Sequence, residues 1–139
     1  MLVAVTAPQI VVGAAIIRER AVLAAQRASP SYMRGRWEFP GGKVDPGETD
    51  TDALVRECQE ELGVLVRPLR RIGGDSVYAR REGSPPAVLR VWTAELLDGD
   101  PVPLEHLTLR WLKVDALDDV DWLPADLPFV DDVRAQLRG

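Results

Sequence analysis

The sequence has little cysteine, no long apolar run and no signal-like start. Its one cysteine, Cys58, has no partner for an internal disulfide or a C-x-x-C zinc pair, which excludes a disulfide-stapled secreted protein. The longest apolar run, Ile10 to Ile17, is far shorter than the roughly 20 residues that cross a bilayer. Residues 1–7 lack the basic and cleavable parts of a signal peptide. We therefore expect a cytoplasmic protein that has no membrane partner.

Positive charge is also scarce. The 17 Lys and Arg residues are outnumbered by 22 Asp and Glu residues, so the net charge is -5. Proteins bind nucleic-acid polymers mainly through Lys and Arg contacts to phosphates, so this balance disfavours a nucleic-acid polymer as partner. A small phosphorylated ligand still fits an acidic protein when carboxylates hold a divalent cation beside it.

The length and composition are those of one folded domain. The chain has 139 residues, of which 46% are hydrophobic and 28% are charged. Both values are close to the average of globular domains, which excludes a disordered or fibrous protein. We expect a single domain over residues 1–139, with residues 1–8 as a flexible N-terminus, and the sequence leaves the oligomeric state open.

Apolar runs alternate with turn-forming residues, which predicts a mixed αβ domain. A loop at 28–35 and two Gly-bearing turns in WEFPGGKVDPGET (residues 37–49) precede the first helix. Asp50 or Thr51 is expected to cap this helix, and Gly63 to end it in the left-handed conformation. The other expected elements are strands at 9–17, 21–27, 64–69, 76–80, 88–96 and 107–114 and a helix at about 128–137.

Three carboxylates share one face of the first helix. On a wheel of 100° per residue, Glu57, Glu60 and Glu61 fall within an arc of roughly 100°, away from the apolar face. An acidic helix face is usually only solvated. Here a Gly-rich loop opens onto the helix, so that its backbone can approach a diphosphate beside the charge of Lys43. Mg²⁺ binds through carboxylates and substrate phosphates, so the pattern favours a site for both.

The spacing of these residues resembles the Nudix box, G-x5-E-x7-R-E-U-x-E-E-x-G-U, in which U is apolar. Gly42, Glu48 and the segment 56–64 match the box at every specified position. For residues drawn from average composition, a chance match in this chain has a probability on the order of 10⁻⁸. The segment that leads into the box, WEFPGGKVDPGET (37–49), and two later segments, PLEHLTLRW (103–111) and WLPAD (122–126), resemble the MutT-type branch of the Nudix hydrolases.

The resemblance implies both a fold and an activity. The fold would be an α/β/α sandwich around a mixed sheet, with the Nudix loop–helix–loop at its site. The activity would be a hydrolase that needs Mg²⁺ or Mn²⁺ and splits a nucleoside triphosphate into monophosphate and pyrophosphate. A MutT-type member would act in nucleotide-pool sanitation and DNA repair.

The resemblance also assigns metal-binding and catalytic residues. Glu57, Glu60 and Glu61 match the metal-binding glutamates of the box, and the carbonyl of Gly41 matches a further metal contact. Glu105 lies where the MutT branch has a metal-linked carboxylate that serves as general base for the water, although an exposed loop acid is the alternative for it. The implied catalytic set is Arg56, Glu57, Glu60, Glu61 and Glu105.

Supporting roles follow from the same match. Arg56 and Glu48 are expected to orient Glu57 rather than to bind metal, because metal sites need such outer contacts. Gly42 and Gly63 are the glycines of the box. His106 is the only histidine of the chain and has no second histidine or nucleophile beside it in the sequence, so we interpret it as structural.

The substrate-binding set is Arg27, Phe39, Lys43 and Asp126. Arg27 and Phe39 match positions that line the nucleoside pocket of the MutT branch, with a strand-end arginine and a core phenylalanine as alternatives. Asp126 replaces an asparagine of the 8-oxoguanine-specific members. An ionised aspartate only accepts hydrogen bonds, which favours the amino group of a cytidine nucleotide. A protonated aspartate can also donate a hydrogen bond, which still allows 8-oxo-dGTP. Alternatively, Asp126 caps the last helix, and Trp122 either stacks on a base or belongs to the core.

Two other functions stay open. The first is a Nudix hydrolase of ADP-ribose or nucleotide sugars, which the MutT-like segments disfavour. The second is a catalytically inactive nucleotide-sensing module, which the four intact glutamates of the box disfavour.

Overall fold

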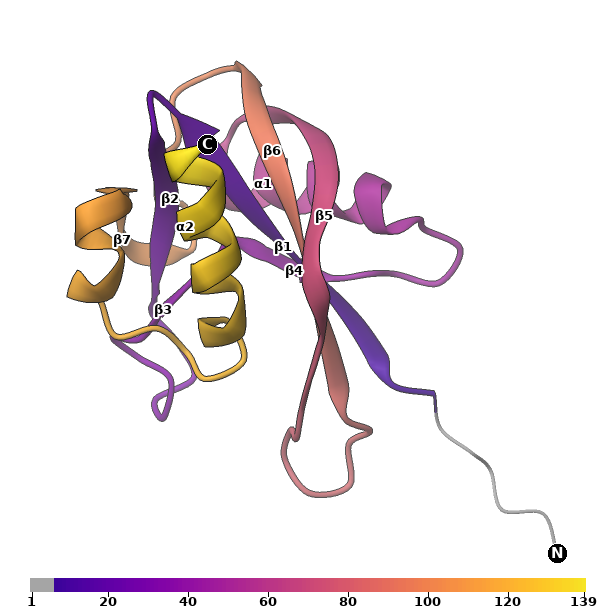
Figure 1. Ribbon diagram of the computed structural model, residues 1–139. Coiled ribbons are helices and arrows are strands. Elements are labelled where there is room, and N and C mark those ends of the chain that lie inside the picture. The colour runs from indigo at the N-terminus through magenta and orange to yellow at the C-terminus, as the bar shows by residue number, and fades with distance from the viewer. Residues whose placement is uncertain (1–6) are drawn as a thin grey trace, which may run out of the picture.

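The computed structural model describes residues 7–139 (Figure 1), so most of the N-terminus expected to be flexible lies outside the described residues. The strands are β1 Gln9–Arg18, β2 Ala21–Arg27, β3 Trp37–Glu38, β4 Gly41–Lys43, β5 Leu65–Tyr78, β6 Ala87–Asp98 and β7 His106–Lys113. The helices are α1 Asp50–Leu62 and α2 Val130–Arg138, and two short 3₁₀ helices, η1 Val114–Asp119 and η2 Leu127–Phe129, lie between β7 and α2.

The sheet is mixed. Its strand order is β3-β2-β1-β6-β5, with β4 paired to β1 and β7 paired to β2. The pairing of β1 with β6 is parallel, and the other pairings are antiparallel. Glu19 and Arg20 join β1 to β2 with positive φ angles of 52° and 62°, which suits the tightest type of hairpin turn.

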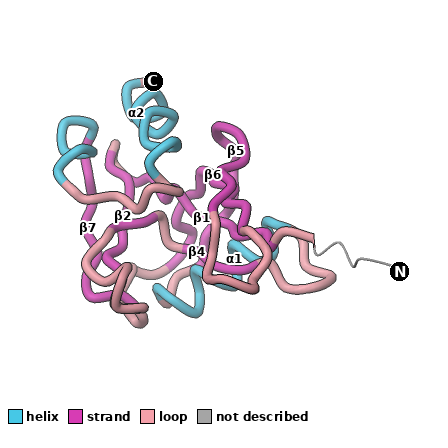
Figure 2. Tube along the Cα trace, turned by 90° about the horizontal axis from the view of Figure 1, so that it is seen from below, coloured by secondary structure: helices cyan, strands magenta, loops and turns pink. Residues whose placement is uncertain are grey.

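Helices cover both faces of the sheet, as Figures 1 and 2 show for α1 on one side of β1 and α2 on the other. Val12, Ala14 and Ile16 pack in the same cluster as the apolar side of α1, whereas Ala15 packs in the cluster that contains α2. The expected α/β/α sandwich is therefore confirmed. Because both faces of β1 are covered, its sequence is continuously apolar rather than alternating.

Helix α1 begins and ends through identifiable caps. The Thr49 hydroxyl oxygen accepts a hydrogen bond from the Asp52 N–H at 3.1 Å, so the cap lies one residue before the expected Asp50 or Thr51. Gly63 ends the helix with φ 67°, in the left-handed conformation that the sequence predicted.

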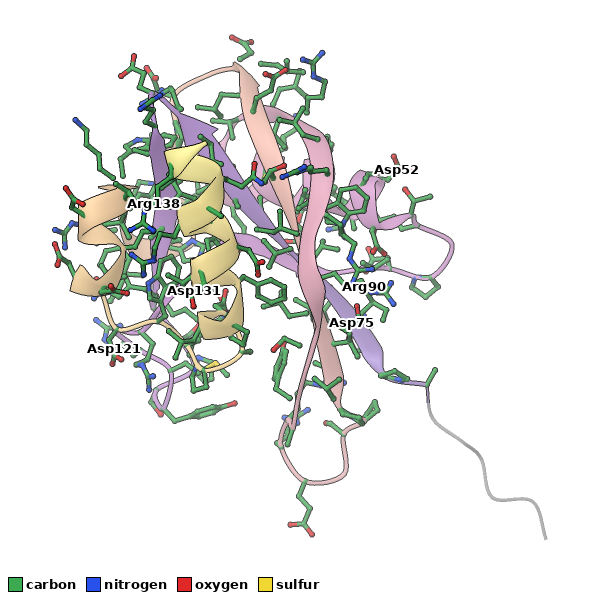
Figure 3. The ribbon with its side chains drawn as sticks, viewed as in Figure 1. Asp52, Asp75, Arg90, Asp121, Asp131 and Arg138 are labelled. Atoms are coloured by element: carbon green, nitrogen blue, oxygen red, sulfur yellow. The ribbon has the colours of Figure 1, made fainter. Side chains whose placement is uncertain are left out.

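An ion-pair network attaches the start of α1 to the sheet. The Arg90 guanidinium on β6 contacts Asp50 at 3.3 Å and Asp75 on β5 at 3.2 Å. Figure 3 shows Arg90 and Asp75 side by side below α1. Arg71 also pairs with Asp75, and these contacts with two guanidinium groups hold the pKa of Asp75 below its usual range. The network links the first turn of α1 to β5 and β6.

Some expected elements differ from the structure. One strand, β5, replaces the two expected at 64–69 and 76–80, because its pairing with β6 continues through register shifts around 68–70 and 72–76. Short strands β3 and β4 form where turns were expected, and neither η1 nor η2 was predicted. Among residues 7–139, no helix combines the length and the apolar character that crossing a bilayer requires.

Candidate active site

A polar cavity of about 400 Å³ lies where β2, β3, α1 and the start of β7 meet. Its wall combines one guanidinium with three carboxylates and one imidazole. The lining residues are Arg27, Ala28, Ser29, Glu38, Glu61, Glu105 and His106. Of these residues, the sequence predicted Arg27, Glu61 and Glu105 as parts of the site, and the structure brings these three together.

Strand pairing places Arg27 and Glu38 on the same face of the sheet. Glu38 is paired with Ala25, which lies two residues before Arg27 and therefore points to the same side. Leu23, of the same parity, packs in the α1 cluster, so this side is the α1 side. The Arg27 Nη1 atom lies 3.0 Å and 3.3 Å from the two Glu38 carboxylate oxygens. Both residues of this pair line the cavity.

Glu61 contributes the most strongly perturbed carboxylate of the cavity. Its residue is only 8% exposed, and its Oε2 atom accepts a hydrogen bond from the Gly41 N–H at 3.2 Å. Burial, together with the negative charges of Glu38, Glu57 and Glu105, raises the pKa of Glu61 to about 9. Such a carboxylate gains most from a cation that neutralises it.

Glu57 lies one turn earlier on α1 and packs against the Gly-rich loop. Burial raises its pKa, and the hydrogen bond from Arg56 partly offsets this effect. A Cβ atom at Gly42 would lie 2.5 Å from the Glu57 Cδ atom, so the loop can approach the carboxylate only because residue 42 has no side chain.

Replacing Gly42 by alanine therefore displaces the Glu57 carboxylate. We expect kcat to fall at least about tenfold, on the scale of a disturbed outer contact of a metal site, while the chain stays folded. The measurement is kcat together with the thermal unfolding midpoint. Gly74→Ala is the matched control, because a Cβ at Gly74 meets nothing within 4 Å. Equal kcat values for the two variants would contradict the expected displacement.

Arg56 connects the carboxylates around Glu57. Its Nε and Nη2 atoms hold Glu48 at 2.7 Å and 2.9 Å, and its Nη1 atom lies 2.9 Å from Glu57 and 3.3 Å from Glu60. Its Nη2 atom also donates to the Lys43 carbonyl at 3.0 Å. The hydrogen bond from Arg56 lowers the pKa of Glu48 to about 2, so Glu48 is a permanent anion. Arg56 thus has the contacts expected of a group that orients Glu57.

The carboxylates form a suitable donor set for a hard divalent cation. Among residues 7–139, no three His, Cys, Asp or Glu side chains are oriented toward one shared ion position. The carboxylates face different partners instead. Glu57 and Glu60 accept hydrogen bonds from Arg56, and Glu61 accepts one from the Gly41 N–H. Burial raises the pKa values of Glu57 and Glu61, and neighbouring carboxylates add to this effect, so a bound cation would stabilise the ionised form of both groups.

Three of the expected substrate-binding residues lie outside the lining of the cavity. Lys43 is exposed on β4, and Phe39 is 3% exposed with its ring centroid 4.7 Å from that of Trp122. Asp126 is 4% exposed and accepts a hydrogen bond from the Phe39 N–H at 2.9 Å. Phe39 and Asp126 are therefore buried behind Glu38 rather than in the cavity wall, and Trp122 belongs to the core.

The interpretation of Asp126 as a cap of the last helix is wrong. Asp126 precedes η2 without a capping hydrogen bond from its side chain, and α2 begins only at Val130. Burial and the negative charge of Glu38 raise the pKa of Asp126 well above its usual value. The carboxyl group therefore bonds inward to the β3 backbone instead of capping a helix.

Four lining residues were not predicted as parts of the site, namely Ala28, Ser29, Glu38 and His106. Glu38 could have been found by strand alternation, since it precedes Phe39 in WEFPGG and pairs with the strand of Arg27. His106 was interpreted as structural, yet its Nε2 atom lies 2.9 Å from Glu38 Oε2 in the wall of the cavity. No sequence pattern signals this contact, because the residues are 68 positions apart.

Comparison with known proteins identifies the family of this chain. The family profile described as NUDIX domain matches residues 7–133. The chain belongs to the NUDIX family. A Mycobacterium tuberculosis protein provisionally named 8-oxo-dGTP diphosphatase 2 is 44% identical over 94% of this chain and 92% of its own. The CTP pyrophosphohydrolase of Escherichia coli is 36% identical over 87% of each chain.

A solved structure agrees with this membership. The MutT NUDIX hydrolase from Burkholderia pseudomallei superposes with a TM-score of 0.78 at 28% identity, over 91% of this chain and 98% of that one. The expected resemblance to MutT-type Nudix hydrolases is therefore confirmed, and the chain is a Nudix hydrolase. Nudix hydrolases generally need a divalent metal ion, which agrees with the crowded carboxylates of α1.

Proposed function

We propose that this Nudix hydrolase splits nucleoside triphosphates into the monophosphate and pyrophosphate and thereby acts in nucleotide-pool sanitation. The observation that carries the proposal is the cavity, whose wall combines Glu61 of α1 and Glu105 of the loop before β7 with Arg27 and Glu38. The two former carboxylates suit metal-bound phosphates, and the polar side chains of Arg27 and Glu38 suit a nucleoside. The names of the two relatives, an 8-oxo-dGTP diphosphatase and a CTP pyrophosphohydrolase, support the same reaction class.

The metal is proposed to be Mg²⁺, with Mn²⁺ as a substitute. The residues that would hold it are Glu57, Glu60, Glu61 and Glu105, together with the carbonyl of Gly41. Oxygen ligands of this kind are those that Mg²⁺ prefers, and Mg²⁺ keeps further positions for phosphate oxygens and water. When bound, the cation neutralises phosphate charge and makes the attacking water more acidic.

The remaining work falls to residues of this chain. Arg56 holds Glu57 in one orientation, and Glu48 in turn holds Arg56 through two hydrogen bonds. Glu105 borders the cavity, and we propose it as the group that takes the proton from the attacking water. Lys43, on the exposed side of β4, adds positive charge near the phosphates.

The nucleoside is proposed to bind beside Glu38 in the cavity, with Arg27 in the same wall and with Phe39 and Asp126 behind it. Asp126 is buried and its carboxyl group accepts a hydrogen bond from the Phe39 N–H, so it supports the wall rather than contacting the base. The names of the two relatives make both cytidine nucleotides and 8-oxo-dGTP candidate substrates.

Side-by-side kinetics test the proposal. With Mg²⁺ present, we expect pyrophosphate release from at least one of dCTP, 5-methyl-dCTP, CTP and 8-oxo-dGTP, with dGTP and ADP-ribose as comparison compounds. Chelation of the metal by EDTA should lower turnover at least about 100-fold, since the carboxylates alone cannot neutralise a triphosphate. Turnover of ADP-ribose alone would contradict the proposed substrate class. The absence of metal-dependent turnover of every compound would favour a nucleotide-sensing module.

A further inference from the structure

A β-bulge at the start of β7 determines which side chain faces the cavity. Gln26 on β2 pairs with Thr108, but the next pair is Arg27 with His106, so Leu107 has no partner. Residues that are paired directly lie on the same face of a sheet, and Arg27 is on the α1 side. A regular ladder would put Leu107 opposite Arg27. The bulge puts His106 there instead, and Leu107 is 41% exposed.

The imidazole of His106 makes one specific contact. Its side chain is 5% exposed, and its Nε2 atom lies 2.9 Å from the Glu38 Oε2 atom. An ionised carboxylate can only accept, so the Nε2–H group is the donor of this bond. The Nδ1 atom is buried and has no hydrogen-bond partner among residues 7–139. A buried N–H without a partner is costly, so the proton of the neutral ring resides on Nε2.

Glu38 is thereby held from two sides. The Arg27 Nη1 atom contacts both carboxylate oxygens, and His106 contacts one of them. A carboxylate has about four acceptor positions, so these three contacts leave one position for a ligand. Glu38 lines the cavity. Because its carboxylate only accepts hydrogen bonds, it favours a ligand that offers an N–H or O–H donor at this position.

We propose that His106 is a positioning residue for nucleobase recognition. Its Nε2–H group keeps the Glu38 carboxylate oriented, so that the remaining acceptor position receives an amino group or ring N–H of the base. This role rests on the proposed function. It explains why a bulge exchanges an apolar side chain for a histidine at this point of the wall. A residue that only fills space would not need a hydrogen-bond donor there.

Two variants of His106 separate the effect of its hydrogen-bond donor from the effect of its side-chain packing. His106→Leu removes the donor, whereas His106→Gln supplies an amide N–H at a similar distance along the side chain. For dCTP and 8-oxo-dGTP, we expect His106→Leu to raise KM at least about tenfold and to leave kcat within about threefold, the effect of losing a hydrogen bond to a charged group. His106→Gln should return KM to within about threefold of the unmodified protein. Leu107→Ala, in the same bulge, is the matched control.

Glu38→Gln tests whether His106 acts through Glu38. The single change should raise KM by a similar factor, and His106→Leu should add nothing further in the Glu38→Gln background, because the two residues act as a unit. Independent, multiplying effects would overturn the proposal. So would a loss of kcat at constant KM, which would mean that His106 acts on the neighbouring Glu105 instead.

A binding measurement makes the outcome independent of turnover. Calorimetry gives the Kd of dCMP and of 8-oxo-dGMP for each variant, and thermal unfolding midpoints show that each is folded. If the unmodified protein binds a monophosphate but hydrolyses no triphosphate, the proposed function fails. The ratio of the Kd of His106→Leu to the Kd of the unmodified protein still decides the role of His106. A ratio near one, or no binding by the unmodified protein, overturns that role.

Discussion

We expect Glu57→Gln to lower kcat at least about 100-fold and to leave the thermal unfolding midpoint close to that of the unmodified protein. Glutamine keeps the size of the side chain but removes the charge that a divalent ligand position requires, and losses of this order are usual for metal ligands and the groups that orient them. The side chain is partly exposed and packs against Gly42, so the substitution leaves no cavity in the core. The measurement is kcat with saturating Mg²⁺, alongside thermal unfolding.

The matched control for Glu57→Gln is Asp52→Asn. Asp52 lies on the same helix, is exposed, and points away from the sheet (Figure 3). It is not part of the cavity wall, so its neutralisation should leave kcat within about twofold, on the scale of a distant surface charge. If Glu57→Gln retained near-normal kcat, the assignment of Glu57 to the metal would be wrong.

Glu61→Gln should have opposite effects on activity and on stability. Turnover should fall at least about 100-fold for the same reason as at Glu57. The metal-free protein should nevertheless become more stable near pH 8, because the substitution removes a buried carboxylate that three other negative charges destabilise. The carboxylate is thus retained at a cost to folding, which is typical of functional sites.

The pH dependence of stability gives this prediction a definite sign. The pKa of Glu61 is about 9 in the folded protein and near 4.5 in the unfolded chain. Between these values the folded state binds a proton that the unfolded state lacks, so the free energy of unfolding falls as pH rises through this window. One such group contributes up to about 1.4 kcal/mol per pH unit. Below pH 4.5 both states are protonated, and this dependence disappears.

Urea unfolding in EDTA at pH 6, 7 and 8 measures the effect. The unmodified protein should lose stability over this range, and Glu61→Gln should show a flatter profile. Added Mg²⁺ should stabilise the unmodified protein more at pH 8 than at pH 6, because a carboxylate must lose its proton to bind the metal. Parallel pH profiles for the two proteins would show that Glu61 does not titrate as described.

Local patterns determined much of α1 and its surroundings. The acidic face, the end at Gly63 and the spacing from Gly42 to Val64 depend on residues of one continuous chain segment, so the sequence alone predicts them. The cap was displaced by one residue, because Thr49, Asp50 and Thr51 are all suitable capping residues and only the backbone geometry selects Thr49.

Asp126 illustrates where local reasoning was misleading. Its position before a helix favours a cap by composition, but its carboxylate accepts a hydrogen bond from the Phe39 N–H, 87 positions away. A buried acceptor bonds to whichever donor the tertiary structure brings close. The same holds for β5, whose two expected pieces join because β6 supplies a continuous partner.

By itself, the sequence determined the family, the reaction class and the carboxylate helix, because these depend on spacing along one chain segment. Only the tertiary structure decided that Glu38 and His106 enter the cavity wall beside Arg27, and that Phe39 and Asp126 lie behind it. The physical reason is register. One unpaired residue, Leu107, changes which side chains of β7 face α1, and a register change of this kind depends on pairing between strands that are about 80 residues apart.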